Sequence, residues 1–270
     1  RKILEIGAGS GILSIEYQKL EELDWTIIEP NPLIDEKCKA KVLKKFFDSN
    51  DINNKEEVTV IHSHVLEHIY SPNQFLGDIS KKLQSGNLML FSIPNMRVML
   101  EKKYVNCINF EHTVFLAEEY VDHLLSINGF NIIEKNYFME DHSIFYATIH
   151  EENAKYIPLP DDLYVRNKEL FLTYVAHHES FVNRINQEIT KCSEKVFLFG
   201  AHIFSQYLIQ TGINVISIEA ILDNDPGKQG KRLYGSSLLV KPPTTLKDEN
   251  EPTVILNAGV YNEEIRTQIL

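Results

Sequence analysis

The stretch KILEIGAGSG at residues 2–11, followed by apolar residues at helical spacing through residue 20, decides the fold of this chain. Its apolar start predicts a strand, its glycines predict a tight turn, and the periodicity that follows predicts a helix. Glycines in such a turn let the backbone come close to a ligand, and the next helix points its free N–H groups at that ligand. The stretch therefore predicts the opening of an α/β fold with a cofactor at the turn.

Strands and helices continue to alternate after this opening. Strands are predicted at 25–29, 58–63 and 88–93, and helices at 33–47, 71–83 and 117–128. A loop of about fifteen residues is expected before the last of these helices. Residues 131–138 and 142–149 are expected to form an antiparallel hairpin. Alternation at this pitch predicts a parallel sheet.

A second, smaller α/β domain is predicted after a linker. Residues 151–162 hold two prolines and paired acids, which is typical of a linker, and a long helix is expected at 163–190. The elements expected beyond it are strands at 196–199, 215–222 and 253–257, a helix ending at 211 and a last helix from 261. We therefore expect a cofactor-binding domain at 1–150 and a Rossmann-like domain at 151–270 that contributes to an acceptor cleft.

Both ends of the chain are expected to be cut. Arg1 is not an initiator methionine, and the first predicted strand begins at the next residue. The last predicted helix stops at Leu270, inside its amphipathic run. We therefore expect the second domain to be truncated at its end.

Composition excludes several classes of protein. The 27 Lys and Arg against 38 Asp and Glu give a net charge of -11, the wrong sign for a nucleic-acid-binding protein. No apolar run reaches the roughly 18 residues that cross a bilayer, and the start is not a signal peptide. Cys38, Cys107 and Cys192 lie far apart, which predicts neither a disulfide framework nor a zinc cluster. We expect a cytoplasmic monomer or homodimer that binds neither nucleic acid nor membrane.

The glycine spacing and one acid narrow the choice of cofactor. A dinucleotide fingerprint places its third glycine at position 12, where this chain has Ile12, and the third glycine is Gly11 instead. Glu29 ends the second predicted strand about 20 residues past the turn, where a carboxylate can accept hydrogen bonds from ribose hydroxyls. Because any adenosine-containing cofactor carries such a ribose, the acid alone does not choose the cofactor, and a nicotinamide oxidoreductase stays an alternative that Ile12 disfavours.

Histidines lie at two predicted ligand-binding positions. His62, His64 and His68 end or follow a predicted strand without a nearby cysteine, so we expect them to be structural or to support the residues that contact a ligand, and we expect no metal. His112 follows Glu111 in the loop after the strand at 88–93. A histidine titrates near neutral pH and an adjacent acid can orient a neighbouring group, so we expect this pair to be catalytic, with His112 as the base.

Three motifs resemble those of class I S-adenosylmethionine-dependent methyltransferases. LEIGAGSG at 4–11 resembles their first, cofactor-binding motif, HVLEHI at 64–69 their fourth-strand motif, and IPN at 93–95 the end of their fifth strand. The resemblance implies a class I methyltransferase Rossmann-like sheet, S-adenosyl-L-methionine as methyl donor and S-adenosyl-L-homocysteine as product. The residues that it implies for cofactor binding are Glu5, Gly7, Ala8, Gly9, Gly11, Glu29, Ser63 and His64.

A narrower resemblance reaches the nucleotide-sugar C-methyltransferases, which act in carbohydrate biosynthesis. FEH at 110–112, with NGF at 128–130, resembles their Glu-His element. FGA at 199–201, ILDNDPGKQG at 221–230 and YG at 234–235 are similar to their carboxy-terminal domain. The resemblance implies C-methylation of a nucleotide-bound keto sugar with His112 as base. The residues that we expect to bind this small-molecule substrate are Asn95, Asn109, Gly200, Ala201 and Asp223.

Two departures from that family keep alternatives open. The family usually carries a tyrosine two residues before the glutamate, where this chain has Asn109. It also usually has an N-terminal cysteine-rich zinc domain, which these 270 residues do not contain. One alternative is therefore O-methylation of a sugar hydroxyl. Another is a cofactor-binding partner subunit without turnover.

Overall fold

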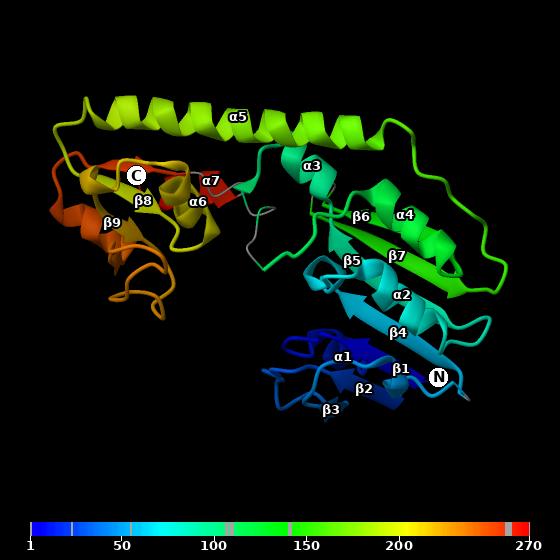
Figure 1. Ribbon diagram of the computed structural model, residues 1–270. Helices are drawn as coiled ribbons and strands as arrows, with labels where there is room; N and C mark the ends of the chain where they lie inside the picture. Colours follow the sequence, from blue (N-terminus) through cyan, green and yellow to red (C-terminus); the bar gives the residue numbers. More distant parts are fainter. Residues whose placement is uncertain are drawn as a thin grey trace. The chain divides into compact units, whose positions relative to one another are not determined.

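The chain folds into two compact units in the computed structural model (Figure 1), which describes residues 2–22, 24–54, 56–105, 108, 111–139, 142–256 and 261–269. One unit comprises residues 1–99 and 110–167, and the other comprises 100–109 and 168–270. Each has its own sheet and its own hydrophobic core. The predicted α/β class with a second, smaller α/β sheet is confirmed, whereas the roles expected of the two parts stay predictions.

The first unit is built on a seven-stranded sheet with the order β3-β2-β1-β4-β5-β7-β6. Its strands are β1 Lys2–Ile6, β2 Asp24–Ile28, β3 Lys41–Leu43, β4 Val58–Ser63, β5 Leu88–Pro94, β6 Phe130–Phe138 and β7 Ser143–His150. The first five strands pair in parallel, and β7 joins β5 and β6 in antiparallel register, as the hairpin prediction requires. The order of the strands changes direction between β1 and β4, because β2 and β3 are added on one side of β1 whereas β4 and β5 are added on the other. Open α/β sheets bind ligands at such a point.

Helices α2, Pro72–Ser80, and α4, Glu118–Ile127, cover one face of this sheet (Figure 1). The main core lies between them and the sheet, and its fully buried members include Val60, Leu76, Ile79, Met89, Val121 and Leu125. Each such side chain stabilises the fold by about 1.5–3 kcal/mol relative to leaving it exposed. This packing holds the carboxyl ends of β4 and β5 in place.

The opposite face carries a smaller core and overturns one prediction. Ile3, Trp25 and Ile27 are buried there beneath Ile34 and Cys38. The helix expected at 33–47 is wrong, because residues 33–40 run without helical structure and 41–43 form the edge strand β3. Two apolar residues four positions apart imitate helical spacing, but β2 offers this segment a sheet ladder and the glycine turn offers it backbone carbonyls.

Three further elements differ from the predictions. The loop expected after β5 contains helix α3, Met96–Glu101, in which Met96, Met99 and Leu100 are buried at helical spacing. The strand expected at 215–222 begins only at residue 218, because 215–217 form a 3-10 turn. Helix α1 is also shorter than expected and covers only Ile12–Tyr17.

The second unit holds a four-stranded parallel sheet with the order β10-β9-β8-β11. Its strands are β8 Val196–Phe199, β9 Ile218–Leu222, β10 Val240–Lys241 and β11 Thr253–Ile255. The helices here are α6 Ile203–Thr211, α7 Asn262–Ile269 and most of α5, Leu163–Ile189. Among the described residues, none of the helices combines the length and apolar composition that crossing a bilayer requires.

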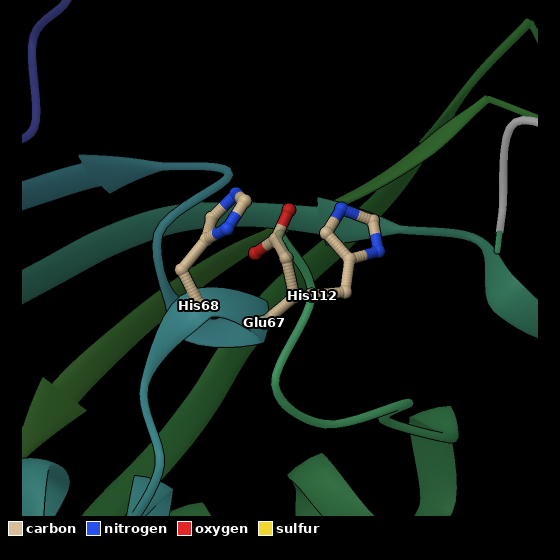
Figure 2. Close-up of side chains that lie close together, drawn as sticks. All are labelled: Glu67, His68 and His112. Carbon is tan, nitrogen blue, oxygen red and sulfur yellow. The ribbon is translucent and has the colours of Figure 1, made fainter. Parts of the chain in front are cut away.

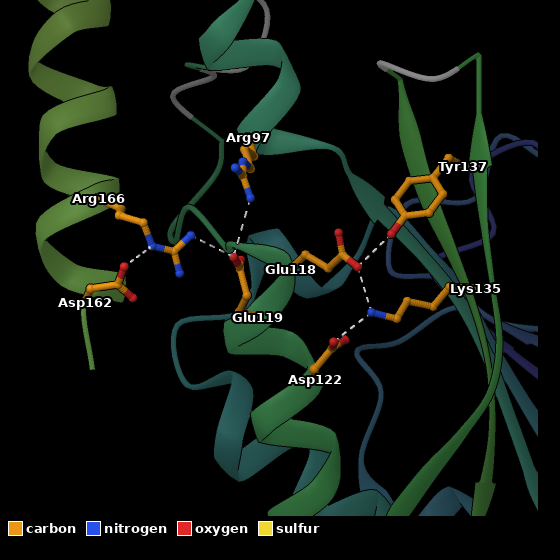
Figure 3. A network of polar contacts seen from close by, with 8 residues as sticks. All are labelled: Arg97, Glu118, Glu119, Asp122, Lys135, Tyr137, Asp162 and Arg166. Carbon is orange, nitrogen blue, oxygen red and sulfur yellow. Dashed lines mark hydrogen bonds and ion pairs between the residues drawn. The ribbon is translucent and has the colours of Figure 1, made fainter. Parts of the chain in front are cut away.

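Charged contacts hold α4 within the first unit (Figure 3). Glu119 on α4 pairs with Arg166 at 3.3 Å, at the start of α5. Lys135 of β6 bridges Glu118 and Asp122 at 2.6 and 2.7 Å. Burial opposes the charge on Lys135, but hydrogen bonds from the ammonium to the two carboxylates raise its pKa above the ordinary value. These contacts fix the position of α4 on the sheet, and the loop that carries His112 leads directly into this helix.

Candidate active site

Most residues singled out in the first domain lie at one edge of the seven-stranded sheet. Parallel strands present their carboxyl ends at the same edge, so turns that are far apart in sequence meet there. The residues at this edge are Gly7, Ala8, Gly9 and Gly11 after β1, Glu29 after β2, Ser63 and His64 at the end of β4, and Asn95 after β5. The structure therefore brings together one turn, one acid and the ends of two further strands.

Gly7 and Gly9 have different surroundings in the turn. Gly7 has φ +71°, and a Cβ added to it stands 2.6 Å from Cγ2 of Val65, so packing against the turn after β4 requires glycine. Gly9 has φ +55°, but an added Cβ meets no heavy atom of the described residues within 4 Å. The backbone at Gly9 is therefore open to a ligand, while Gly7 is closed by the protein itself.

Glu29 faces the same turn. Its Oε2 accepts a hydrogen bond from the Gly9 N–H at 3.4 Å, and its Oε1 accepts one from the Asn31 N–H at 2.9 Å. Each carboxylate oxygen has a further lone pair. The acid is thus held beside the open glycine with the capacity to accept hydrogen bonds from ligand hydroxyls.

Glu5, the penultimate residue of β1, has a buried side chain with a partner within the protein. Its side chain is 4% exposed, and its Oε2 accepts a hydrogen bond from the indole N–H of Trp25 at 2.8 Å. Burial raises the pKa of Glu5 above its ordinary value, partly opposed by that hydrogen bond. The carboxylate is thus paired on the sheet face that carries the small core, and its contact with a cofactor stays a prediction.

Ser63 and His64 end β4 in an unusual backbone conformation. The Ser63 hydroxyl lies 2.7 Å from the hydroxyl of Ser92 on β5. His64 has φ +52°, which is uncommon for a residue with a side chain. Its Nδ1 lies 3.0 Å from Oε1 of Glu67 and its Nε2 lies 2.9 Å from Oγ of Ser143. The imidazole thus links the turn after β4 to the start of β7.

The loop that carries His112 is docked on the 3-10 turn Leu66–His68. The Thr113 N–H donates to the carbonyl of Glu67 at 2.9 Å, and Nδ1 of His68 donates to the carbonyl of Glu111 at 2.8 Å. The rings of His68 and His112 face each other edge-on, with centroids 5.0 Å apart (Figure 2). The main-chain carbonyl of Glu111 therefore helps to dock this loop on the turn. Asn109, which was also predicted here, lies outside the described residues.

Glu67 is a site residue that the sequence reasoning missed. Its side chain is 2% exposed and lies between His68 and His112 (Figure 2). One carboxylate oxygen meets His64, while Oε2 is buried and has no hydrogen-bond partner among the described residues. A buried acid is unusual enough to signal a function. In the sequence, the only signal for a role of Glu67 was its position between His64 and His68.

His62 in β4 and Asn95 after β5 are both buried. His62 lies within the core, stacked on Phe91 with ring centroids 4.8 Å apart, and burial lowers its pKa to about 3. Asn95 is buried at the end of β5, where its N–H donates to the carbonyl of His142 at 3.0 Å. His62 is thus a core residue, whereas Asn95 lies at the same sheet edge as His64.

The second unit brings its own three predicted residues together. Oδ2 of Asp223 accepts hydrogen bonds from the Ala201 N–H at 2.7 Å and from the Lys228 ammonium at 3.2 Å. Burial opposes ionisation, but these donors and the Asp225 N–H lower the pKa of Asp223 below its ordinary value. Gly200 has φ +100°, and an added Cβ stands 2.8 Å from Nε2 of His202. The Ala201 N–H, next to Gly200, is thus already paired with the Asp223 carboxylate.

Residues 1–135, half of the chain, match the family model described as a methyltransferase domain. No curated protein matches the chain in sequence. A solved S-adenosylmethionine-dependent methyltransferase from Archaeoglobus fulgidus is similar to it, with 16% identity, a TM-score of 0.44 and coverage of 55% of this chain and 86% of that one. So is magnesium protoporphyrin IX methyltransferase from Synechocystis with bound S-adenosylhomocysteine, with 15% identity, a TM-score of 0.40 and coverage of 56% and 74%.

Proposed function

Because this chain belongs to the methyltransferase-domain family and is an S-adenosylmethionine-dependent methyltransferase, we propose that its acceptor is a nucleotide-activated sugar. The preferred acceptor atom is a carbon of a keto sugar, and His112 is the base. The observation that carries this proposal is the docking of the His112 loop on the turn after β4, which holds an imidazole at the same sheet edge as the glycine turn.

The geometry of the glycine turn suits the cofactor. S-adenosylmethionine supplies an electrophilic methyl group on its sulfonium when bound. The open backbone at Gly9 accommodates the ligand's close approach, and the Glu29 carboxylate accepts hydrogen bonds from the ribose hydroxyls. Ala8, Gly11, Ser63 and His64 complete the proposed cofactor site, and Gly7 shapes its turn by packing against Val65. Glu5 stabilises it indirectly, through the sheet face that it shares with Trp25.

His112 has one chemical task in this proposal. For a keto sugar it takes the proton from the carbon next to the carbonyl, which makes that carbon nucleophilic as an enolate. Bound S-adenosylmethionine would supply the methyl group, with its methyl–sulfur bond breaking and S-adenosylhomocysteine as the leaving group. The edge-on ring of His68 and the carboxylate of Glu67 limit the positions that the His112 ring can take. Orientation of this kind contributes to rate because acceptor and methyl must meet in line at about 3–3.5 Å.

Asn95 and Asp223 are the described polar side chains that we propose for substrate binding. Asn95 supplies an amide at the end of β5 in the first unit, with Asn109 as a further predicted contact. Asp223 is already paired with the Ala201 N–H beside Gly200, so its remaining lone pairs favour hydroxyl groups of a sugar or ribose over a phosphate. A cytoplasmic, reduced setting also belongs to the proposal, supported by the free thiols of Cys38 and Cys192.

Two alternatives are tested by the same assay. O-methylation requires His112 to deprotonate a hydroxyl instead of a carbon, and a non-catalytic partner subunit requires cofactor binding alone. The test is calorimetric titration with S-adenosylhomocysteine, with NADH as control, followed by mass spectrometry of keto and hydroxy nucleotide sugars after incubation with S-adenosylmethionine. Methylation of a keto sugar at carbon supports the proposal, and methylation of a hydroxyl alone overturns the carbon acceptor. Cofactor binding without any methylated sugar favours the partner subunit.

A further inference from the structure

Three side chains with metal-ligating groups converge on one point in the first unit. Glu67 and His68 come from the 3-10 turn after β4, and His112 comes from the loop docked on that turn. Figure 2 shows the carboxylate between the two imidazoles, and one ligand atom from each residue lies within 4.8 Å of the others. Ligands of one zinc ion stand roughly 3 to 4 Å apart at ordinary bond lengths, so small side-chain rotations close the remaining gap.

The buried carboxylate is the second observation. Glu67 is 2% exposed, and its Oε2 has no hydrogen-bond donor within the part of the chain that the structure describes. A carboxylate taken out of water in this way is costly unless a cation or a donor compensates it. A metal ion between this oxygen and the imidazoles supplies that compensation.

The orientation of His68 is the third. Its Nδ1 donates to the carbonyl of Glu111 at 2.8 Å, which fixes the ring and leaves the lone pair on Nε2. Histidines that bind metals commonly donate their other ring N–H to a carbonyl or carboxylate in this manner. His68 is therefore held in the tautomer that a metal ligand needs.

We infer that Glu67, His68 and His112 form a binding site for a divalent transition-metal ion of the Zn²⁺ class. Two imidazoles and one carboxylate suit such an ion better than Mg²⁺ or Ca²⁺, which prefer oxygen ligands. The inference replaces our expectation that no metal binds near His62, His64 and His68. That expectation considered only the residues at the end of one strand. The third ligand comes from a different loop, which docks on the turn through Thr113, 46 positions after Glu67.

Occupancy by a metal has a consequence for methyl transfer that rests on the proposed role of His112. A nitrogen lone pair that binds an ion cannot also accept a proton, so a bound ion inhibits the enzyme. The metal-bound chain and the active chain are then alternative states of one cluster.

Calorimetric titration of the chelator-treated chain with ZnCl₂ tests the site without cofactor or acceptor. Its failure is therefore distinguishable from a failure of the proposed function. We expect one equivalent of Zn²⁺ to bind, and His68→Ala and Glu67→Gln each to weaken that binding by at least about tenfold. Co²⁺ in place of Zn²⁺ gives a visible absorption spectrum that reports nitrogen and oxygen ligation directly.

A matched control separates this site from adventitious binding. His177→Ala removes an exposed histidine on α5 and should leave the Zn²⁺ affinity unchanged. Circular dichroism checks that both variants fold, because Glu67→Gln changes a buried side chain and His68→Ala removes a partly exposed ring together with its hydrogen bond to the Glu111 carbonyl. If Glu67→Gln does not fold, His68→Ala still tests the site. No stoichiometric binding by the unmodified chain, or equal binding by His68→Ala and the unmodified chain, overturns the inference.

Discussion

The N–H of Thr113 donates to the carbonyl of Glu67 at 2.9 Å, and this contact joins the loop that carries His112 to the turn that ends β4. A second hydrogen bond runs in the opposite direction, from Nδ1 of His68 in the turn to the carbonyl of Glu111 in the loop. Two short segments thus hold each other at the carboxyl edge of the sheet. Hydrogen bonds to two main-chain carbonyls thus hold the loop that carries His112 against this turn.

Replacing His112 should separate chemistry from cofactor binding. We expect His112→Ala to reduce turnover by about 10²–10⁴-fold, the usual contribution of a general base, and to leave S-adenosylhomocysteine affinity within a few-fold. Single-turnover kinetics and calorimetry measure the two quantities. Unchanged turnover removes His112 from the mechanism. Because Thr113 and Glu111 hold the loop through main-chain groups, the variant keeps the docking contacts.

Gly7→Ala should destabilise the fold. Its φ of +71° strains any side chain, and the new Cβ stands 2.6 Å from Val65 Cγ2, so we expect a loss of about 2–4 kcal/mol. Thermal unfolding measures this loss. Gly86→Ala is the matched control, because Gly86 has φ +91° but open space among the described residues around it, and should cost only about 1 kcal/mol. Equal losses in the two variants contradict a packing role for Gly7.

Gly9→Ala should affect the ligand and spare the fold. The new methyl group enters the open side of the turn, where an added Cβ meets no described atom within 4 Å. We expect S-adenosylhomocysteine affinity to fall by about tenfold or more, because the backbone can no longer approach the ligand, and Tm to fall less than in Gly7→Ala. Calorimetry with a parallel melting curve measures both. Normal affinity means that the ligand does not contact Gly9.

The two acids near the turn should behave differently. Glu29→Gln removes a charge that faces Gly9 and should weaken S-adenosylhomocysteine by about tenfold, the loss of roughly one charge-assisted hydrogen bond. Glu5→Gln keeps an acceptor for the Trp25 indole and should change that affinity by less than about threefold. A large loss of affinity in Glu5→Gln restores Glu5 to the cofactor site.

Stability should depend on pH through His62. Burial lowers the pKa of His62 to about 3 from 6.5, so the unfolded chain binds this proton more readily than the folded one. The contribution is complete above pH 6.5 and declines as pH falls toward 3, by about 2 kcal/mol at pH 5. Denaturant unfolding at pH 7.5 and pH 5 measures it. His62→Leu should flatten this dependence, and an equally steep dependence in that variant assigns the effect to other groups.

Sequence spacing misled where the surroundings satisfied the backbone in another way. Ile34 and Cys38 have the spacing of a helix face, yet their segment pairs with β2 and with the glycine turn. Glu5 stands in the expected motif, but alternation along β1 turns its side chain into the sheet face with Trp25. In both cases tertiary contacts outweighed a local pattern.

The order of strands and helices, the glycine turn, the acid after β2 and the family were determined by the sequence itself, because each depends on residues within one or two neighbouring elements. The cluster of Glu67, His68 and His112 was decided only by the tertiary structure. Its defining hydrogen bonds join residues 43 and 46 positions apart, and they form only when the loop after β5 meets the turn after β4. The local spacing of residues does not predict this contact, because only the folded sheet brings the ends of β4 and β5 together.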